Sequence, residues 1–334
     1  MSKLSYITGR LAKIDYKSFI KSAQKIKKRS GKPVIMTLAD MVYCGAKYGA
    51  GYRDYELYRF EELDSNLRKT YITRQMNDVI VRTLNDRKFY HFFDNKADFA
   101  EKFKAFLGRE VMSLAKTDKQ SIAEFLNKHN TVLLKPADGL CGTGIEKLTA
   151  ENADEIYSKI GKNYILEECL VQHEKMSEMY SEAVNTIRVV TILKNGYVHI
   201  PFCFLRIGAC HNVVDNFNAH GLLAPVDVKT GITTDFACTK QNEIYEKHPD
   251  TATPTKGFQI PFWKDVIDLC RTAAKVVPEM GYIGWDVCVT PNGPVLIEGN
   301  NLPGYDIYQM PAHRQGNKAG KKAVIENIYP GIFN

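Results

Sequence analysis

Two acidic residues and an amide toward the C-terminal end have types and spacing suited to holding a divalent cation. Asp286 lies in an alternating, strand-like segment, and Glu298 and Asn300 lie in a second one, twelve residues later. Asn292-Gly293 between them favours a hairpin turn, which would bring Asp286 opposite the end that carries Glu298 and Asn300. Residues two apart in a strand share one face. Two carboxylates and an amide oxygen form a hard, all-oxygen site suited to Mg²⁺ held together with nucleotide phosphates.

The alternative for these residues is a strand edge with solvated acids. The apolar run of residues 295–297 argues against it, because this run leads Glu298 toward the interior. A buried acid without a partner is costly, so we expect a metal ion or another cation beside it.

A glycine-rich segment follows a short β-type run that ends near Lys135. Its glycines, Gly139, Gly142 and Gly144, let the backbone turn tightly and present N–H groups to an anion. The ammonium group of Lys135 can reach a phosphate oxygen. Because the lysine precedes the glycines, the segment is neither a Walker loop nor a Rossmann fingerprint. Glycines at this spacing also occur in ordinary hairpins, so the segment alone does not establish nucleotide binding.

The elements that must position these residues are a mixture of strands and helices. Residues 187–193 and 197–206 predict a strand pair joined by an Asn-Gly turn. Shorter strands are expected at 131–135 and 164–167. Helices are expected at 96–106 and 263–278, and Ser121 with Glu124 fits a capping box that would start another helix.

Residues 1–88 are expected to be mostly helical. The aromatic cluster of residues 52–60 is consistent with packing or with a substrate groove, and its periodicity favours packing.

The composition is that of a globular protein of ordinary hydrophobic content, 44%, with 25% charged residues. No run of about 18 apolar residues predicts a membrane-spanning helix, and the start of the chain lacks an apolar signal segment, so we expect a cytoplasmic protein. The eight cysteines include no C-x-x-C pair, which favours reduced thiols over disulfides or a zinc site.

The net charge of +7 comes from the N-terminal segment, because residues 1–33 carry ten Lys or Arg and one acidic residue. Such a segment could meet anionic lipid, nucleic acid or an acidic substrate. The alternative is the solvated face of an amphipathic helix, with Tyr16, Phe19, Ile20, Ala23 and Ile26 on its apolar face. We expect no nucleic-acid partner and keep a weak contact with an anionic membrane surface open.

The order of these motifs resembles the ATP-grasp superfamily: a lysine and glycine loop, then a distant Asp, then Glu298-x-Asn300-x-x-Pro303-Gly304. The resemblance covers about residues 90–325. Segments 184–191, 205–208 and 215–216 are similar to the sugar-transfer associated branch of that superfamily. The resemblance implies an α+β, ATP-grasp fold in which two α+β lobes clamp ATP, behind an N-terminal helical segment. It divides the chain into residues 1–88, 89–170 and 171–334.

The resemblance also implies roles at matching positions. Lys96 corresponds to the first nucleotide-binding lysine, although the usual Asp-Lys pair is Asn-Lys here. Lys135 corresponds to the second lysine, on the α-phosphate. The loop over the β- and γ-phosphates comprises Gly139, Gly142, Thr143 and Gly144. Two Mg²⁺ ions are expected at Asp286, Glu298 and Asn300.

The adenine and substrate sides of the site are implied in the same way. The hinge strand that binds adenine comprises Glu167, Glu168, Cys169 and Leu170. Glu167 and Glu168 alternate across the strand, so which of them faces adenine stays open. His173 or Glu174 could reach the ribose, or His173 could be a surface residue. Asp215 and Asn216 are candidate substrate residues.

Arg188 and Arg206 lie on neighbouring predicted strands, in a region that faces the transferred phosphate in enzymes of this type. An arginine fork there would stabilise an acyl phosphate and the later oxyanion. The alternative is structural arginines paired with Asp215 or a glutamate.

The activity implied is carboxylate activation by ATP, in which an acyl phosphate forms and an amine then attacks it to give an amide. The substrates would be a small carboxylate and an amine, such as an amino acid and a sugar-linked or peptide-like acceptor, in polysaccharide or cell-surface biosynthesis. Two other hypotheses are a kinase-like phosphotransferase that acts on a hydroxyl and a nucleotide-binding module without catalysis.

Overall fold

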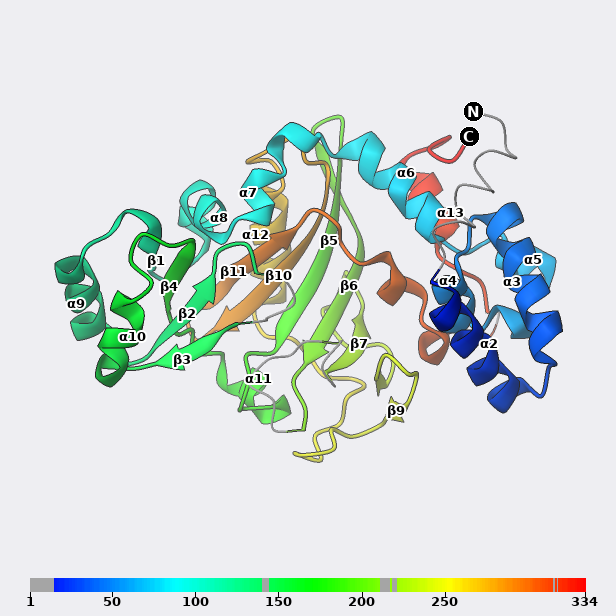
Figure 1. Cartoon of the computed structure of the whole chain (residues 1–334), viewed down its shortest axis with the longest axis horizontal. Coiled ribbons are helices and arrows are strands. Elements are labelled where there is room, and N and C mark those ends of the chain that lie inside the picture. Colours follow the sequence, from blue (N-terminus) through cyan, green and yellow to red (C-terminus); the bar gives the residue numbers. More distant parts are fainter. Residues whose placement is uncertain (1–14, 140–143, 211–216, 218–220, 315, 317) are drawn as a thin grey trace. The chain divides into compact units, whose positions relative to one another are not determined.

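A computed structural model of the chain describes residues 15–139, 144–210, 217, 221–314, 316 and 318–334 (Figure 1). The chain divides into two compact units. One comprises the residues up to Thr83 together with Gly304–Asn334, and the other comprises Leu84–Pro303. The last 31 residues therefore belong with the N-terminal helices, whereas the sequence suggested one continuous segment from 171 to 334.

The first unit is helical, as expected from its sequence. Its principal helices are α2 (Tyr16–Ser30), α3 (Val34–Tyr48), α4 (Tyr52–Leu57), α5 (Ser65–Arg68), α6 (Arg74–Leu84, whose last residue belongs to the second unit) and α13 (Lys322–Ile328). Tyr55, Tyr58, Phe60 and Tyr71 are fully buried in its core. The aromatic cluster of residues 52–60 thus serves packing, as its periodicity predicted.

Helix α2 shows how the basic N-terminal segment is used. Its N-cap is Asp15, which accepts a hydrogen bond from the backbone of Ser18, and its inner face buries Ala23 and Ile26. The amphipathic-helix interpretation is therefore confirmed for Ala23 and Ile26. It is wrong for Tyr16 and Ile20, which are exposed.

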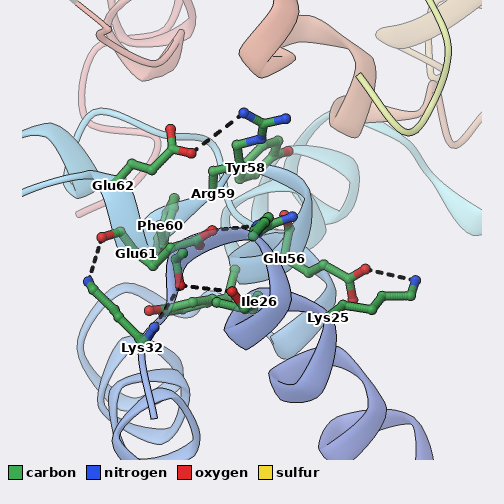
Figure 2. Close-up of polar contacts among 12 residues, drawn as sticks. Lys25, Ile26, Lys32, Glu56, Tyr58, Arg59, Phe60, Glu61 and Glu62 are labelled. Atoms are coloured by element: carbon green, nitrogen blue, oxygen red, sulfur yellow. Dashed lines mark hydrogen bonds and ion pairs between the residues drawn. The ribbon is translucent and has the colours of Figure 1, made fainter. Parts of the chain in front are cut away.

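Three basic residues in and just after α2 bind groups of the same unit (Figure 2). Arg29 forms an ion pair with Glu61 at 2.6 Å, and Lys25 pairs with Glu56 at 3.0 Å. Lys32, just beyond the helix, donates to the carbonyl of Glu61 at 2.6 Å. These contacts hold α2 against α4 and the turn that follows it, so part of the basic segment has a structural role.

In the second unit, a four-stranded antiparallel sheet has the order β1-β4-β2-β3. Its strands are β1 (Val111–Ser113), β2 (Val132–Pro136), β3 (Glu146–Leu148) and β4 (Tyr164–Glu168). Helices α9 (Lys119–Lys128) and α10 (Ala153–Tyr157) cover one face through a common apolar core. The expected start of α9 at Ser121 is wrong: Asp118 is the N-cap and accepts from the Ser121 amide at 2.8 Å.

A larger, seven-stranded antiparallel sheet has the order β11-β10-β5-β6-β7-β8-β9. Its strands are β5 (Thr186–Lys194), β6 (Tyr197–Ile207), β7 (Leu222–Val226), β8 (Ala237–Cys238), β9 (Ile244–Tyr245), β10 (Tyr282–Thr290) and β11 (Gly293–Asn300). The β5–β6 turn has positive φ at Asn195 and Gly196, which confirms the predicted Asn-Gly hairpin.

Helices on this larger sheet are shorter than their sequences suggested. α12 (Trp263–Ala273) packs on β5, β10 and β11 and ends five residues before Pro278. α8 (Lys96–Lys102) is followed by a separate 3₁₀ turn, Lys104–Phe106, instead of continuing as one helix. α7 (His91–Asp94) and α11 (Glu174–Met179) complete this part. Among the described residues, each helix is too short or too polar to cross a bilayer.

Candidate functional site

The β10–β11 hairpin brings the predicted metal-binding residues together. Asp286 lies directly opposite Glu298, and Gly284 lies opposite Asn300. Glu298 and Asn300 share a face, while Gly299 between them faces Phe93 and the buried Trp285. An added Cβ at Gly299 would lie 2.9 Å from the Phe93 ring, so the strand needs glycine there. The predicted hairpin and the meeting of these residues are confirmed, but the predicted Asn292-Gly293 turn is wrong: Gly293 pairs with Thr290 at the start of β11, so Pro291-Asn292 form the turn.

Asp286 is almost completely buried and is held by both predicted arginines. Arg188 lies opposite it on β5 and binds it in a fork, with Nε–Oδ1 at 2.6 Å and Nη2–Oδ2 at 2.9 Å. Arg206 on β6 donates from Nη1 to Oδ2 at 2.8 Å. Burial would raise the pKa of Asp286, but the two guanidinium groups outweigh it and lower the pKa to about 2. Among the described residues both arginines pair with Asp286, whereas Asp215, the partner considered in the structural alternative, lies outside the described residues.

Gly284 gives Arg188 the room to reach Asp286. A Cβ at this position would lie 3.1 Å from Cδ of Arg188 and 2.7 Å from Cβ of Pro303. The backbone at Gly284 therefore admits both the arginine stem and the proline of the motif that follows β11.

Glu298 is in a different electrostatic state from Asp286. Its Oε1 accepts from Nδ2 of Asn300 at 3.2 Å, and no basic side chain among the described residues forms an ion pair with it. Burial and the nearby charge of Asp286 raise the pKa of Glu298. A half-buried carboxylate in this state is favourable for binding a cation, and the donor set of two carboxylates and an amide fits Mg²⁺.

Lys135 and Glu167 form a second buried cluster on neighbouring strands β2 and β4. Lys135 Nζ lies 2.6 Å from Oε2 of Glu167. Arg109 lies on the other side of this carboxylate, with Nε 3.4 Å from the same oxygen. Burial would raise the pKa of Glu167, but Arg109 and Lys135 together lower it to about 2. Glu168 points the other way, toward Glu110 and His129, so Glu167 is the glutamate directed into the site.

Lys96 links the start of the glycine-rich segment to both clusters. Its ammonium group donates to the carbonyl of Gly139, and its backbone amide donates to the carbonyl of Ala137 at 2.7 Å. Burial lowers the pKa of Lys96, and Glu298 opposes that effect. The preceding Asn95 caps α8 by accepting from the amide of Ala97 at 2.8 Å. The change from the usual Asp to Asn thus keeps the residue's capping role.

The other predicted residues divide into three groups. Gly144 has φ of +72°, and its position against Pro136 leaves little room for a Cβ. Cys169 and Leu170 follow β4 and are partly exposed, whereas Glu174 is exposed at the start of α11. Gly142, Thr143, Asp215 and Asn216 lie outside the described residues.

His173 caps α11 and does not stand free. Its Nδ1 accepts from the amide of Lys175 at 3.1 Å, and its ring lies edge-on to Phe262 at 5.7 Å. Its backbone amide donates to the carbonyl of Val289 at 2.7 Å. The sequence suggested a ribose contact or a surface residue and did not predict this capping role.

Arg109 is the residue that sequence reasoning missed. Arg109 belongs to no motif, and the one hint in the sequence is the glycine before it. In the structure this residue, Gly108, has φ of +57°. A Cβ on Gly108 would lie 2.3 Å from Cγ1 of Val295 on β11. A glycine is therefore required where the chain passes β11, immediately before Arg109.

A profile of the sugar-transfer associated ATP-grasp family matches residues 75–323. The chain belongs to this family. Its ATP-grasp fold, with mixed helices and sheets and a helical N-terminal region, is the fold expected from the sequence. None of the curated proteins compared shows a significant sequence match.

Solved structures share low identity with this family member. It is similar to the ATP-grasp ligase PsnB complexed with minimal precursor, at 14% identity over 66% of this chain and 54% of that one, with a TM-score of 0.41. It is also similar to D-alanyl-alanine synthetase A from Vibrio cholerae, at 15% identity over 73% of this chain and 66% of that one, with a TM-score of 0.42. The D-alanine-D-alanine ligase from Coxiella burnetii is 12% identical over 64% of this chain and 49% of that one, with a TM-score of 0.39. The chain thus spans about half to two thirds of the length of these structures.

Proposed function

We propose that this protein is an ATP-dependent, Mg²⁺-using carboxylate–amine ligase. The observation that carries the proposal is the pairing of Asp286 with Glu298 across the β10–β11 hairpin, faced by Arg188 and Arg206. This arrangement places acceptors for a hard cation beside donors for a phosphate. Membership in an ATP-grasp family supports ATP as the nucleotide.

The nucleotide side of the site is assigned to residues of the smaller sheet and of α8. Lys96 and Lys135 bind phosphate oxygens, and Gly139 to Gly144 supply backbone N–H groups to the same phosphates. Glu167 orients Lys135, since the two lie 2.6 Å apart in a buried setting. The backbone of residues 167–170 binds the adenine edge.

Asp286, Glu298 and Asn300 would hold Mg²⁺, which supplies positive charge to the phosphates when it is bound. Arg188 and Arg206 act on the substrate side. Each offers guanidinium N–H groups beside Asp286, where charge builds up on the phosphoryl group and later on the oxyanion of the attacked carboxyl. Because the arginines are already held by Asp286, they pay little ordering cost when substrate arrives.

The finer substrate proposal is an amino acid joined to a sugar-acid or peptide-like acceptor, in polysaccharide or cell-surface biosynthesis. The family description, which associates these proteins with sugar transfer, supports it. A kinase-like phosphotransferase is the second candidate, because the same cation and phosphate residues serve a hydroxyl acceptor.

An ADP-release screen with carboxylate and amine libraries tests these proposals. A ligase requires both substrates and releases ADP and phosphate, whereas a kinase yields a stable phosphorylated product without an amine. Glu298→Gln is the matched control, since it keeps the shape of the site and removes one carboxylate charge. Unchanged turnover in this variant contradicts the metal-binding role of Glu298, and a wild-type protein that binds ATP but releases no ADP with any substrate pair favours a nucleotide-binding module.

We further propose that the N-terminal helical unit makes a peripheral contact with an anionic membrane surface from the cytoplasmic side. Residues 1–83 and 304–334 contain 21 Lys or Arg and 10 Asp or Glu, whereas residues 84–303 contain 24 and 28. Lys17, Lys21, Lys27 and Lys28 of α2 are exposed, as is Lys25, which pairs with Glu56. The outer face of α3 exposes apolar side chains, namely Ile35, Met36, Val42 and Tyr43. Exposed lysines and exposed apolar side chains together are the two features with which peripheral proteins bind an anionic bilayer surface.

Vesicle co-sedimentation tests this contact with the full chain. Replacing Lys17, Lys21, Lys27 and Lys28 by Gln is expected to lower binding to phosphatidylserine vesicles at least tenfold, because each lysine near the surface contributes about 1 kcal/mol. Lys264→Gln with Lys275→Gln, in the other unit, is the control. Equal losses in both variants, or binding to neutral vesicles alone, would contradict the proposal.

A further inference from the structure

Arg109 connects the two clusters of the site through a single buried guanidinium group. Only 3% of its side chain is exposed. Nε and Nη2 each lie 3.4 Å from an oxygen of Glu167 on β4. On the opposite side, Nη1 donates to the carbonyl of Leu296 at 2.7 Å and Nη2 donates to the carbonyl of Ile297 at 3.2 Å. These two carbonyls belong to β11, directly before Glu298.

The carbonyls that Arg109 binds lie at a β-bulge. The β10–β11 ladder pairs Asp286 with Glu298 but Val287 with Leu296, so Ile297 is an extra residue on β11. A bulge interrupts the ladder and redirects the side chains that follow it. Its backbone carbonyls need other donors when they are shielded from water, because an unsatisfied buried carbonyl is costly.

The bulge decides the face to which Glu298 belongs. Leu296 is fully buried in the core beside Val287. In a regular strand, Glu298 would share that face with Leu296, because residues two apart point the same way. The extra residue places Glu298 on the opposite face, with Asp286. The position of the proposed metal-binding carboxylate therefore depends on the bulge.

The same guanidinium group keeps Glu167 charged. If Lys135 turns toward a phosphate, Glu167 loses its nearest cation, which lies at 2.6 Å. Arg109 remains fixed by the β11 carbonyls and stays beside the carboxylate. Glu167 therefore need not compete with the nucleotide for Lys135.

We propose that Arg109 is a positioning residue that fixes the β11 bulge, and with it Glu298, against the strand that carries Glu167. This inference rests on the proposed function in that it takes Glu298 as a metal-binding residue. The proposal predicts that Arg109 affects metal affinity at the nucleotide site, although its own side chain is buried.

The test compares Glu167→Gln with the double variant Arg109→Met, Glu167→Gln. The double variant leaves no uncompensated carboxylate, so the pair differs only by the guanidinium group at the bulge. Mn²⁺ affinity is measured by electron paramagnetic resonance in the presence of a non-hydrolysable ATP analogue, and analogue affinity is also measured without metal. We expect the double variant to lose about 10- to 100-fold in Mn²⁺ affinity, as supporting residues of metal sites do. Metal-free analogue binding should change less than threefold.

Hydrogen–deuterium exchange without any ligand provides an independent measurement. The amides of residues 296–300 should exchange faster in the double variant, while those of β6 should not change. Equal exchange and equal Mn²⁺ affinity in the two variants would overturn the proposal. Faster exchange in a protein that binds no nucleotide would contradict the proposed function but would support the positioning role of Arg109. Arg109→Lys should restore part of the Mn²⁺ affinity, because a lysine can still donate to one carbonyl.

Discussion

Asp286 and Glu298 face each other across one hairpin, yet the structure predicts opposite effects when each is made neutral. Asp286→Asn leaves Arg188 and Arg206 buried beside an amide. Glu298→Gln removes a charge whose pKa is raised by burial and by Asp286. The two substitutions are isosteric and lie opposite each other, so each serves as the control for the other.

The magnitude for Asp286 follows from its ion pairs. Its pKa falls from 3.8 to about 2, which corresponds to about 2–3 kcal/mol of net preference for the charged carboxylate. Breaking a buried pair by removing one partner costs about 3–5 kcal/mol, because the remaining charges stay buried. We therefore expect Asp286→Asn to destabilise the ligand-free protein by several kcal/mol and to lower the midpoint of thermal unfolding by roughly 10 °C.

For Glu298 the sign is reversed. An acid with a raised folded-state pKa lowers stability at any pH above its unfolded pKa of about 4.3, so neutral Gln should leave stability at pH 8 unchanged or increase it. The difference between wild type and Glu298→Gln should vanish as the pH falls toward 4. Thermal unfolding from pH 4 to 8, with and without Mg²⁺ and an ATP analogue, measures both effects. The stabilisation by Mg²⁺ and the analogue should disappear in Glu298→Gln. Loss of ligand-free stability in that variant, or a retained ligand effect, would refute the reasoning.

Three further substitutions test other parts of the chain. Gly284→Ala should lower turnover strongly, at a cost of about 1–3 kcal/mol in unfolding free energy, because its Cβ meets Pro303 and the stem of Arg188. A kinetic assay with a thermal melt separates the two effects. Glu167→Gln should flatten the acid-unfolding profile: the low pKa of Glu167, about 2, gives stability present above pH 4–5 and lost as the pH falls toward 2. Asp118→Ala should cost about 1 kcal/mol in denaturant unfolding, since it removes the cap of α9.

The sequence predicted the β10–β11 hairpin and the β5–β6 hairpin correctly because their signals are local. Alternating side chains define the strands, and a two-residue turn joins each pair, Asn195-Gly196 in β5–β6 and Pro291-Asn292 in β10–β11. These local signals bring Asp286 near the end of β11 that carries Glu298. The exact pairing of Asp286 with Glu298 depends on the bulge at Ile297, and Arg188 lies opposite Asp286 because the distant strands β5 and β10 pair.

Contacts between distant segments could not be predicted in the same way. Glu167 and Glu168 are adjacent, identical in type and on opposite faces, and only the positions of Lys135 and Arg109 distinguish them. The bulge at Ile297 also has no local signal, since the residue is an ordinary β-former. At α9, Asp118 and Ser121 are both good caps, and the sequence rule favoured the wrong one.

The charge balance of the site connects these observations to its ligand. In the protein alone, Asp286 is neutralised by two arginines, whereas Glu298 has an elevated pKa and no ion-pair partner among the described residues. A bare anion would satisfy the arginines but repel Glu298, and a bare cation would satisfy Glu298 but repel the arginines. A nucleotide phosphate that arrives with a divalent cation meets both requirements together. If the proposed function is correct, binding of metal and nucleotide should be strongly cooperative, each raising the affinity for the other by the same factor. Independent binding of the two would show that Asp286 keeps both arginines and that Glu298 has another partner.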